Sequence, residues 1–446
     1  MNGPSFRIAG IPVRIDLTFF LIVFVLGFGA RSGTLLVAWV VIVTGSVLLH
    51  ELGHALAFRR YGQEPQILLQ GMGGLTSGSG APLRPSHDIV VSLAGPLTGL
   101  ILLGIPALVL ARSSVELTPT WQTVVEDIVF VNLAWSLVNL LPVLPLDGGR
   151  TTAALWEAVT GKPGERQVHM LSVTVAGAAG LFALTRGYLF GTLFAGFFIA
   201  YNVSQLSAAR NARLGSGLVE GWRALGRGEA DAAEAAAERA LADRPSAEIM
   251  VHAMELQAWA RLAAGRPDDA RAAVAHFPHG RVPSDLLTGT LELEARRSEE
   301  GLSHLLAVYA SHDYGPAMPM AAAAVARAGL VDTFLDRLCA PGGPGPTAVA
   351  DFAVHLHVAG RYDEAATANR RALDAADAFG DGGEARVAYN LACSHARAGQ
   401  VGPALEWLER AVAAGFADIA LLDSDPDLDG LRDDDRYRVL RARLGG

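Results

Sequence analysis

The sequence predicts an all-α protein: a polytopic membrane domain of about six transmembrane helices, followed by a soluble α-solenoid. Two observations support this prediction. Residues 1–215 carry only 10 acidic and 13 basic side chains among long apolar runs, whereas residues 216–446 carry 35 acidic and 23 basic ones. In that second half, glycine-containing turns recur between Ala-rich amphipathic segments. We therefore expect a membrane domain at residues 1–210 and a helical-repeat domain at residues 216–446.

Six apolar runs are long enough, or nearly so, to cross a bilayer, since about 20 apolar residues in a helix span its hydrocarbon core. They lie at roughly 15–30, 34–57, 88–111, 124–145, 168–185 and 188–206. Cytoplasmic segments of membrane proteins carry an excess of Lys and Arg. With the N-terminus inside, the inner segments hold Arg7, Arg14, Arg59, Arg60, Arg84, Arg150, Lys162, Arg166, Arg210 and Arg213, and the outer ones hold Arg31, Arg112 and Arg186. This asymmetry predicts a multi-pass protein of the cell membrane with both termini in the cytoplasm.

Composition narrows the class of partner and the cell compartment. The net charge of −9 is concentrated in the second half, which argues against nucleic acid binding. The two cysteines, Cys339 and Cys393, imply no disulfide framework, and this fits a reducing cytoplasm. A single lysine, Lys162, accompanies 35 arginines, which indicates a GC-rich bacterial genome.

The pentapeptide His50-Glu51-Leu52-Gly53-His54 lies inside the second apolar run. Histidines at i and i+4 on a helix share one face at the spacing that grips a zinc ion, and the Glu between them is placed to activate water. Ionisable groups at membrane depth are costly and indicate function. The alternative is that both histidines face a polar cavity without a metal.

Asp147 follows the fourth apolar run, which descends to the same side of the membrane as the second. Two prolines upstream break the helix and two glycines downstream free the backbone, so we expect Asp147 to reach the histidines as a third zinc ligand. Three protein ligands with one position left for water are typical of a catalytic zinc site. The alternative is that Asp147 caps a helix beginning near Thr151.

Two further segments are candidates for contact with a substrate. Residues 66–76 are apolar and glycine-rich, which predicts a short β-hairpin or re-entrant loop whose edge, with Gly73 and Gly74, binds an extended chain. A plain cytoplasmic loop is the alternative. Asn139, inside the fourth run, either donates to the substrate carbonyl oxygen or bridges two helices.

The second half contains Gly-Arg or Gly-Gln turns at 226, 265, 360 and 399, and the first two and the last two are each 39 residues apart. Helix–turn–helix units at such a period resemble a tetratricopeptide solenoid, whose concave face would bind a substrate tail or a regulator. Residues 280–350 blur the pattern, and we expect a break near 340–347. The last section, residues 423–432, resembles the segment that often follows such repeats.

Three ordered motifs resemble the site-2 protease family of intramembrane zinc metalloproteases. They are His-Glu-Leu-Gly-His in the second run, Ala94-Gly95-Pro96 in the third, and Asn-x-x-Pro-x-x-Pro-Leu-Asp-Gly-Gly in the fourth. The resemblance covers about residues 1–210. It implies His50, His54 and Asp147 on one Zn²⁺ ion, Glu51 as catalytic base, Asn139 near the substrate, and a 66–76 loop that helps to hold an unwound substrate strand.

The sequence departs from the family pattern at three places. No PDZ-like insert fits between the second and third runs, no cystathionine-β-synthase-type pair is apparent, and Gly99 stands where relatives often have Asn. The resulting expectation is an intramembrane endopeptidase of the lipid bilayer that cleaves peptide bonds in or near transmembrane segments of membrane proteins. A catalytically silent membrane-anchored scaffold is the main alternative, although it has no reason to keep all four site residues. Zinc transport would spread ligands along several spans.

Overall fold

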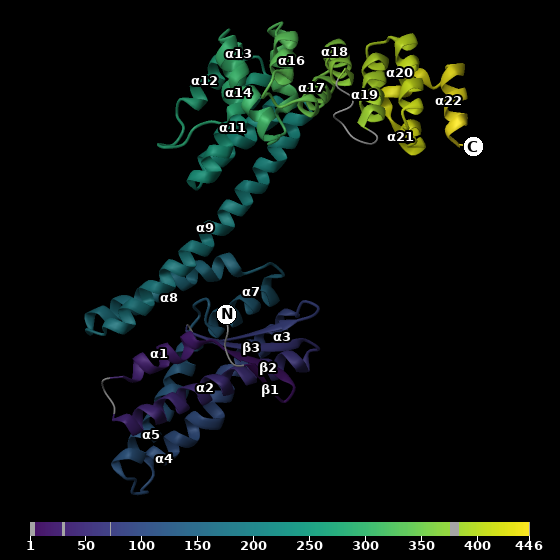
Figure 1. The fold of residues 1–446 in the computed structure, drawn as a ribbon. Helices are drawn as coiled ribbons and strands as arrows, with labels where there is room; N and C mark the ends of the chain where they lie inside the picture. The colour runs from purple at the N-terminus through teal and green to yellow at the C-terminus, as the bar shows by residue number, and fades with distance from the viewer. Residues whose placement is uncertain (1–4, 29–31, 72, 375–382, 446) are drawn as a thin grey trace. The chain divides into compact units, whose positions relative to one another are not determined.

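The computed structural model describes residues 5–28, 32–71, 73–374 and 383–445 (Figure 1). The chain divides into two compact units, Met1–Ala209 and Arg210–Gly446. Both are mostly helical, and the first also contains one β-sheet. Arg31, one of the three outer arginines, and Met72, in the expected 66–76 loop, lie outside the described residues.

The sheet of the first unit has four strands in the order β1-β2-β3-β4. They are β1 Ser5–Ile8, β2 Ile11–Ile15, β3 Glu64–Gln70 and β4 Gly73–Ser79. Strand β2 runs parallel to β3, and the other pairs are antiparallel. The expected hairpin at 66–76 is therefore β3–β4, but the all-α prediction missed β1 and β2. Ile11, Val13 and Ile15 are buried and alternate with exposed residues, which is the period of a strand with one covered face.

The helices of the first unit follow most of the apolar runs. They are α1 Leu17–Gly27, α2 Gly33–Arg60, α3 Pro85–Gly99, α4 Ile105–Arg112, α5 Pro119–Val129, α6 Trp135–Asn139, α7 Asp147–Thr160, α8 Glu165–Thr185 and α9 Leu189–Gly226, the last continuing into the second unit. π-Helical turns, η1 Leu100–Gly104 and η2 Phe130–Ala134, join α3 to α4 and α5 to α6.

Within the first unit, four of the described helical stretches are long and apolar enough to cross a membrane: 33–60, 85–112, 165–185 and 189–226. The predicted first span is shorter than expected, because residues up to Ile15 form a strand and α1 has 11 residues. The fourth predicted run corresponds to the helical stretch 119–139, which is not among the four. These long apolar helices support a location in a membrane.

Helix α2 contacts the sheet through β3 and β4 and also contacts α3. Apolar side chains of β2, β3 and α1 form a core with Trp39 and Ala55 of α2. Farther along, the buried amide of Asn132 donates to Ser46 of α2 at 2.9 Å. A Cβ at Gly99 would lie 3.4 Å from the Asn132 side-chain oxygen, so the space left by this glycine faces Asn132.

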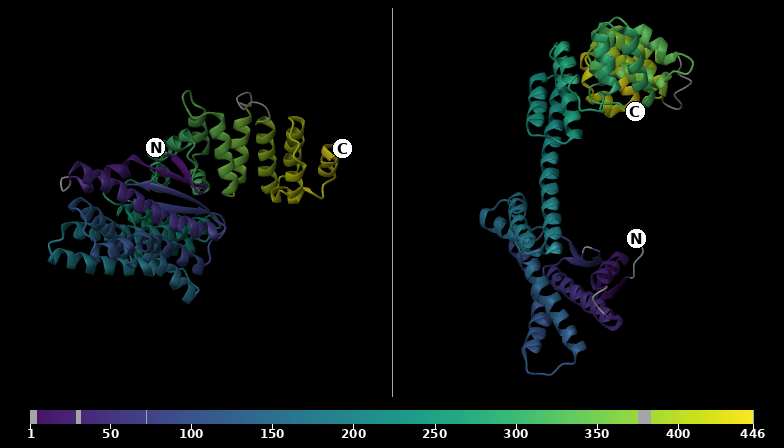
Figure 2. Two further views of the ribbon diagram at one scale, coloured as in Figure 1. Left: turned by 90° about the horizontal axis from the view of Figure 1, so that it is seen from below. Right: turned by 90° about the vertical axis from the view of Figure 1, so that its left-hand side faces the viewer.

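The second unit consists of helices that pack in sequence (Figures 1 and 2). They are α10 Ala230–Ala242, α11 Ala247–Ala263, α12 Pro267–Val274, α13 Asp285–Glu294, α14 Ser298–Ser311, α15 Met318–Arg327, α16 Val331–Cys339, α17 Pro346–Val358, α18 Tyr362–Leu373, α19 Gly383–Arg397, α20 Val401–Ala413, α21 Ile419–Ser424 and α22 Asp435–Gly445, with a 3₁₀ turn, η4, at Pro426–Leu431. One core cluster contains Leu338 and Ala348, so packing continues across the segment 340–347.

A residue with left-handed backbone closes each of six helix–turn–helix hairpins in the described part of this unit. These residues are Gly228, Gly265, Arg296, Gly329, Gly360 and Gly399, at spacings of 37, 31, 33, 31 and 39 residues. Two hairpins, at Arg296 and Gly329, lie in the region where the sequence pattern was blurred. The hairpin at Arg296 could not be recognised in the sequence, because an arginine occupies a position that usually requires glycine.

Replacing Arg296 by glycine should stabilise its hairpin. Its φ is +62°, a conformation that costs a residue with a Cβ about 1 kcal/mol relative to glycine. We expect amide hydrogen exchange in α13 and α14 of the full chain to slow about fivefold. The matched control is Gly329→Ala, where φ is +69° and no atom lies near the added Cβ, so exchange should become faster in α15 and α16. Faster exchange in Arg296→Gly would contradict the strain argument.

Candidate metal centre

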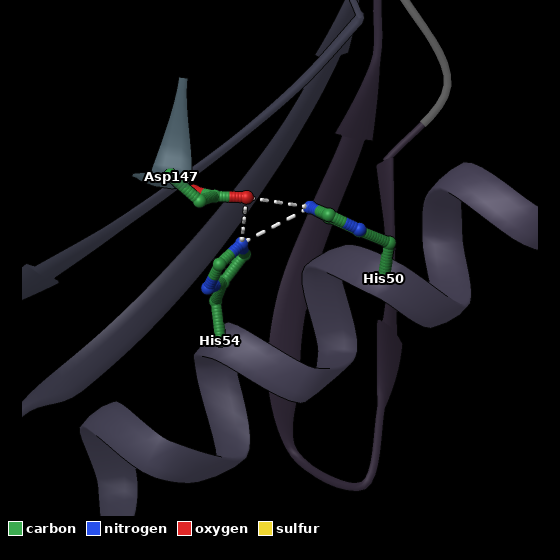
Figure 3. Close-up of side chains that lie close together, drawn as sticks. All are labelled: His50, His54 and Asp147. Atoms are coloured by element: carbon green, nitrogen blue, oxygen red, sulfur yellow. Dashed lines mark hydrogen bonds and ion pairs between the residues drawn. The ribbon is translucent and has the colours of Figure 1, made fainter. Parts of the chain in front are cut away.

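Two histidines project from one face of α2 toward a common point (Figure 3). Residues four apart in an α-helix lie one above the other, so the imidazoles of His50 and His54 are neighbours. Their Nε2 atoms are 3.1 Å apart. Both side chains are mostly buried, with 13% of His50 and 7% of His54 exposed. The helix therefore presents two nitrogen donors side by side before any other element contributes.

The orientation of His54 is set from α3. Its Nδ1 lies 2.7 Å from the carbonyl oxygen of Val91, so Nδ1 carries the proton and donates it. The Nε2 lone pair is then free to face the centre, an arrangement typical of metal-binding histidines. Gly95, one turn further along α3, makes room for the ring, because a Cβ at that position would overlap Nε2 of His54.

Asp147 approaches the same point from another helix. It is the first residue of α7, and its Oδ2 lies 3.1 Å from Nε2 of His50 and 3.3 Å from Nε2 of His54. The capping alternative for Asp147 is wrong in this structure, because the N-cap is Leu146 and no side chain caps the helix. The helix also begins at Asp147 rather than near Thr151.

The three donor atoms fit a small divalent cation. Donors bonded to a tetrahedral zinc ion at about 2.0–2.1 Å lie about 3.3–3.4 Å apart. The separations of 3.1, 3.1 and 3.3 Å are close to that geometry. Two imidazole nitrogens and one carboxylate oxygen are also a common donor set of catalytic zinc sites. His50, His54 and Asp147 are thus the residues that could hold the metal.

Glu51 lies beside this group on α2 and is 5% exposed. Its Oε2 accepts a hydrogen bond of 2.6 Å from Oγ1 of Thr76 in β4, which also lies 3.2 Å from the Glu51 carbonyl oxygen. Gly74 of the same strand lies against the carboxylate, because a Cβ there would overlap it. The sheet therefore fixes the Glu51 side chain. This contact gives Gly74 a role that the sequence did not suggest.

The remaining predicted residues are less closely connected with the group. Gly73 begins β4 with a φ of +117° and open space around it. Asn139 ends α6 and is half-buried, and no hydrogen bond links it to His50, His54 or Asp147 among the described residues. Thr76 and the Val91 carbonyl were missed from the sequence. A threonine on a strand that faces the His-Glu-Leu-Gly-His motif could have indicated Thr76, but recognising it required knowledge of the register of β4.

The chain is similar to known metalloproteases over part of its length. Residues 113–184 match the model of peptidase family M50. This match, together with the relatives described next, confirms the resemblance to the site-2 protease family.

The relatives include two proteins named for zinc metalloprotease activity. A predicted zinc metalloprotease of Synechocystis, sll0528, is 32% identical over 38% of this chain and 46% of its own length. Zinc metalloprotease MJ0392 of Methanocaldococcus jannaschii is 30% identical over 34% of this chain and 44% of its own length. The chain thus spans less than half of these relatives. The solved site-2 protease from Methanocaldococcus jannaschii matches with 24% identity and a TM-score of 0.34, over 46% of this chain and 95% of that one.

The second unit contains a further group of metal-type donors: Cys393, Asp425 and Asp427. Its carboxylates are already engaged. Asp425 accepts from the Tyr389 hydroxyl and from the backbone N–H of Asp427, and His357 lies 2.8 Å from Asp427. Burial, with the two carboxylates, raises the pKa of the Cys393 thiol and disfavours the thiolate that metals bind. We interpret the group as a polar cap of η4.

Gly95→Ala should damage the candidate metal centre without replacing any of its three donor residues. The added methyl group would overlap His54 Nε2, so the imidazole must rotate away. We expect zinc affinity of the purified protein to fall at least about tenfold, measured by chelator competition. Gly99→Ala, one turn along the same helix, adds a methyl group 3.4 Å from Asn132 and should retain the affinity. Equal affinities for the two variants would contradict the packing argument.

Proposed function

We propose that this protein is an intramembrane zinc endopeptidase of the site-2 type. The observation that carries the proposal is the convergence of His50, His54 and Asp147 to within 3.3 Å, beside the buried carboxylate of Glu51, in a unit with apolar helices. The M50 match and the zinc metalloprotease relatives support the same class of reaction.

His50, His54 and Asp147 would hold one Zn²⁺ ion per chain. When bound, zinc supplies a Lewis acid that lowers the pKa of water and polarises a peptide carbonyl. Glu51 then serves as general base, taking a proton from the attacking water and delivering it to the leaving amine. The Thr76 hydroxyl holds one carboxylate oxygen of Glu51, which leaves the other to accept that proton.

The proposed substrates are transmembrane segments of other membrane proteins. A peptide bond in a helix is shielded by its neighbours, so the segment must unwind before attack. Strand β4 pairs with β3 on one side, and within the described residues no strand pairs with its other edge. An unwound segment added to that edge would pass Gly73 and Gly74 and lie next to Glu51. Asn139 is proposed to donate to the substrate carbonyl from the end of α6.

We further propose that the protein crosses the cell membrane with both termini in the cytoplasm. The four long apolar helices, the shorter α1 and the helical stretch 119–139 together account for six apolar runs. The excess of Lys and Arg in the inner segments supports the orientation. The active centre would then lie toward the cytoplasmic end of α2, close to Arg59 and Arg60.

The second unit is proposed to be a tetratricopeptide-like solenoid that recruits a substrate tail or a regulator. Six hairpins with an inner spacing of 31–33 residues are near the 34-residue period of that repeat class. Stacked helix pairs of this kind form a concave surface suited to an extended peptide.

Glu51→Gln should separate metal binding from catalysis. The amide is nearly isosteric with the carboxylate and cannot act as a base, so we expect zinc content to be retained and cleavage of a transmembrane reporter to fall about 10²–10⁴-fold. Asp147→Ala is the companion variant and should lose both zinc and cleavage. A wild-type protein that binds no zinc, or a Glu51→Gln variant with full activity, would exclude the protease and favour the silent scaffold.

Deleting residues 216–446 should change which proteins are captured. The Glu51→Gln variant is expected to retain uncleaved substrates, so membrane proteins that co-purify with it can be compared between the full chain and the truncated one. If the repeat unit recruits substrates, the truncated trap captures fewer of them while still binding zinc. An unchanged set of captured proteins would rule out recruitment but would leave the proposed chemistry intact.

A further inference from the structure

The irregular segment before Asp147 is hydrogen-bonded at Leu144 to side chains of α8 and α9. Residues 140–146 contain two prolines and five backbone N–H groups. Four of these groups donate to carbonyl oxygens of residues 136–143. The fifth, the N–H of Leu144, donates instead to the side chain of Ser172 in α8 at 2.9 Å. The fully buried Ser172 therefore pairs with the one N–H group of this segment that finds no carbonyl partner in residues 136–143.

The carbonyl group of Leu144 is held as well. Nδ2 of Asn202 in α9 donates to it at 2.7 Å, and Nδ2 also donates to the Phe198 carbonyl oxygen. Because the amide nitrogen faces these two oxygens, Oδ1 faces His169 and accepts its Nδ1–H at 2.7 Å. Asn202 and Ser172 are both 0% exposed. Two fully buried side chains from two helices thus hold both polar groups of one residue.

Leu144 in turn contacts the first turn of α7, which carries Asp147. A Cβ at Gly149 would lie 2.5 Å from the Leu144 nitrogen, so the two stretches of backbone are in direct contact. The intervening chain is short, and Leu146 N–H donates to the Val143 carbonyl oxygen at 2.8 Å. A shift of Leu144 must therefore move the start of α7, and Asp147 is its first residue.

We propose that Ser172 and Asn202 are positioning residues for Asp147, and that they hold its carboxylate at the distance from the histidines that a metal requires. His169 keeps the Asn202 amide in the orientation that serves Leu144. The inference rests on the proposed metal centre. It adds that α8 and α9, which carry none of the three donor atoms, determine where the third donor lies. Partners of this kind typically contribute about 10–100-fold to metal affinity.

The test measures Zn²⁺ affinity of the full-length protein in detergent by competition with a chromogenic chelator. It also records the visible ligand-field spectrum of the Co²⁺-loaded protein, which depends on the number and geometry of the ligands. Ser172→Ala and Asn202→Leu should each weaken Zn²⁺ binding about 10–100-fold and change the Co²⁺ spectrum. Asn202→Asp should behave like Asn202→Leu, because it keeps the size but loses both N–H donors. Ser172→Thr keeps the hydroxyl group and should restore the affinity.

Asn132→Leu is the matched control. Asn132 is also buried, and its amide also donates to the carbonyl four residues earlier and to another helix, but within the described residues neither of these bonds involves residues 140–147. Replacing Asn132 should change Zn²⁺ affinity by no more than about twofold. The control thereby separates the general effect of removing a buried amide from a loss of Asp147 positioning. If Asn202→Leu fails to fold, Ser172→Ala decides, since it removes a single oxygen atom.

The double variant Ser172→Ala/Asn202→Leu should lose less affinity than the product of the two single losses, because both side chains hold the same residue. Unchanged affinity and spectra in Ser172→Ala and Asn202→Asp, with Asp147→Ala strongly impaired, would overturn the inference and leave the proposed function standing. If the wild-type protein binds no Zn²⁺, or if Asp147→Ala binds it normally, the proposed metal centre itself is wrong.

Discussion

The centre depends on a stretch of irregular backbone being held among apolar helices. Residues 140–146 connect α6 to α7, and the backbone polar groups of such a connection need hydrogen-bond partners. Two prolines reduce the number of N–H groups, local bonds satisfy most of the rest, and α8 and α9 supply the bonds at Leu144. The segment held in this way places the Asp147 carboxylate 3.1 Å from Nε2 of His50 and 3.3 Å from Nε2 of His54.

Close approach of backbone to side chain is the second requirement. Gly74 lies against Glu51, Gly95 against His54, and Gly149 against the chain that precedes α7. At each of these positions a Cβ would occupy the space of a site residue or of its support. The result is a small polar group with little exposure to solvent, in which electrostatic interactions are stronger than in water. Glycine at these three positions therefore allows the dense packing around the candidate metal centre.

The sequence was informative where the signal was local and weak where it depended on tertiary contacts. The spacing of His50 and His54 identifies neighbours on any α-helix, and the turn around Asp147 marks a break in the helical pattern. Thr76 could not be found, because its contact with Glu51 follows from the register of β3 with β4. Ser172 and Asn202 are separated from Leu144 by 28 and 58 residues and resemble ordinary polar residues in apolar helices. The turn at Arg296 is not apparent from the sequence, because an arginine stands where glycine stands in the other hairpins.

The three donor residues are held in place by different contacts, and Asp147 depends most on packing between helices. His50 and His54 are held relative to each other by one helix, so their spacing survives small changes in packing. Asp147 has no such internal reference, since its position depends on bonds from α8 and α9 to Leu144 and on the contact of Gly149 with that residue. Loosening of the helix packing would therefore move the carboxylate before it separates the histidines. We therefore expect the three donors to converge only when these helices are packed, which would couple metal affinity to folding.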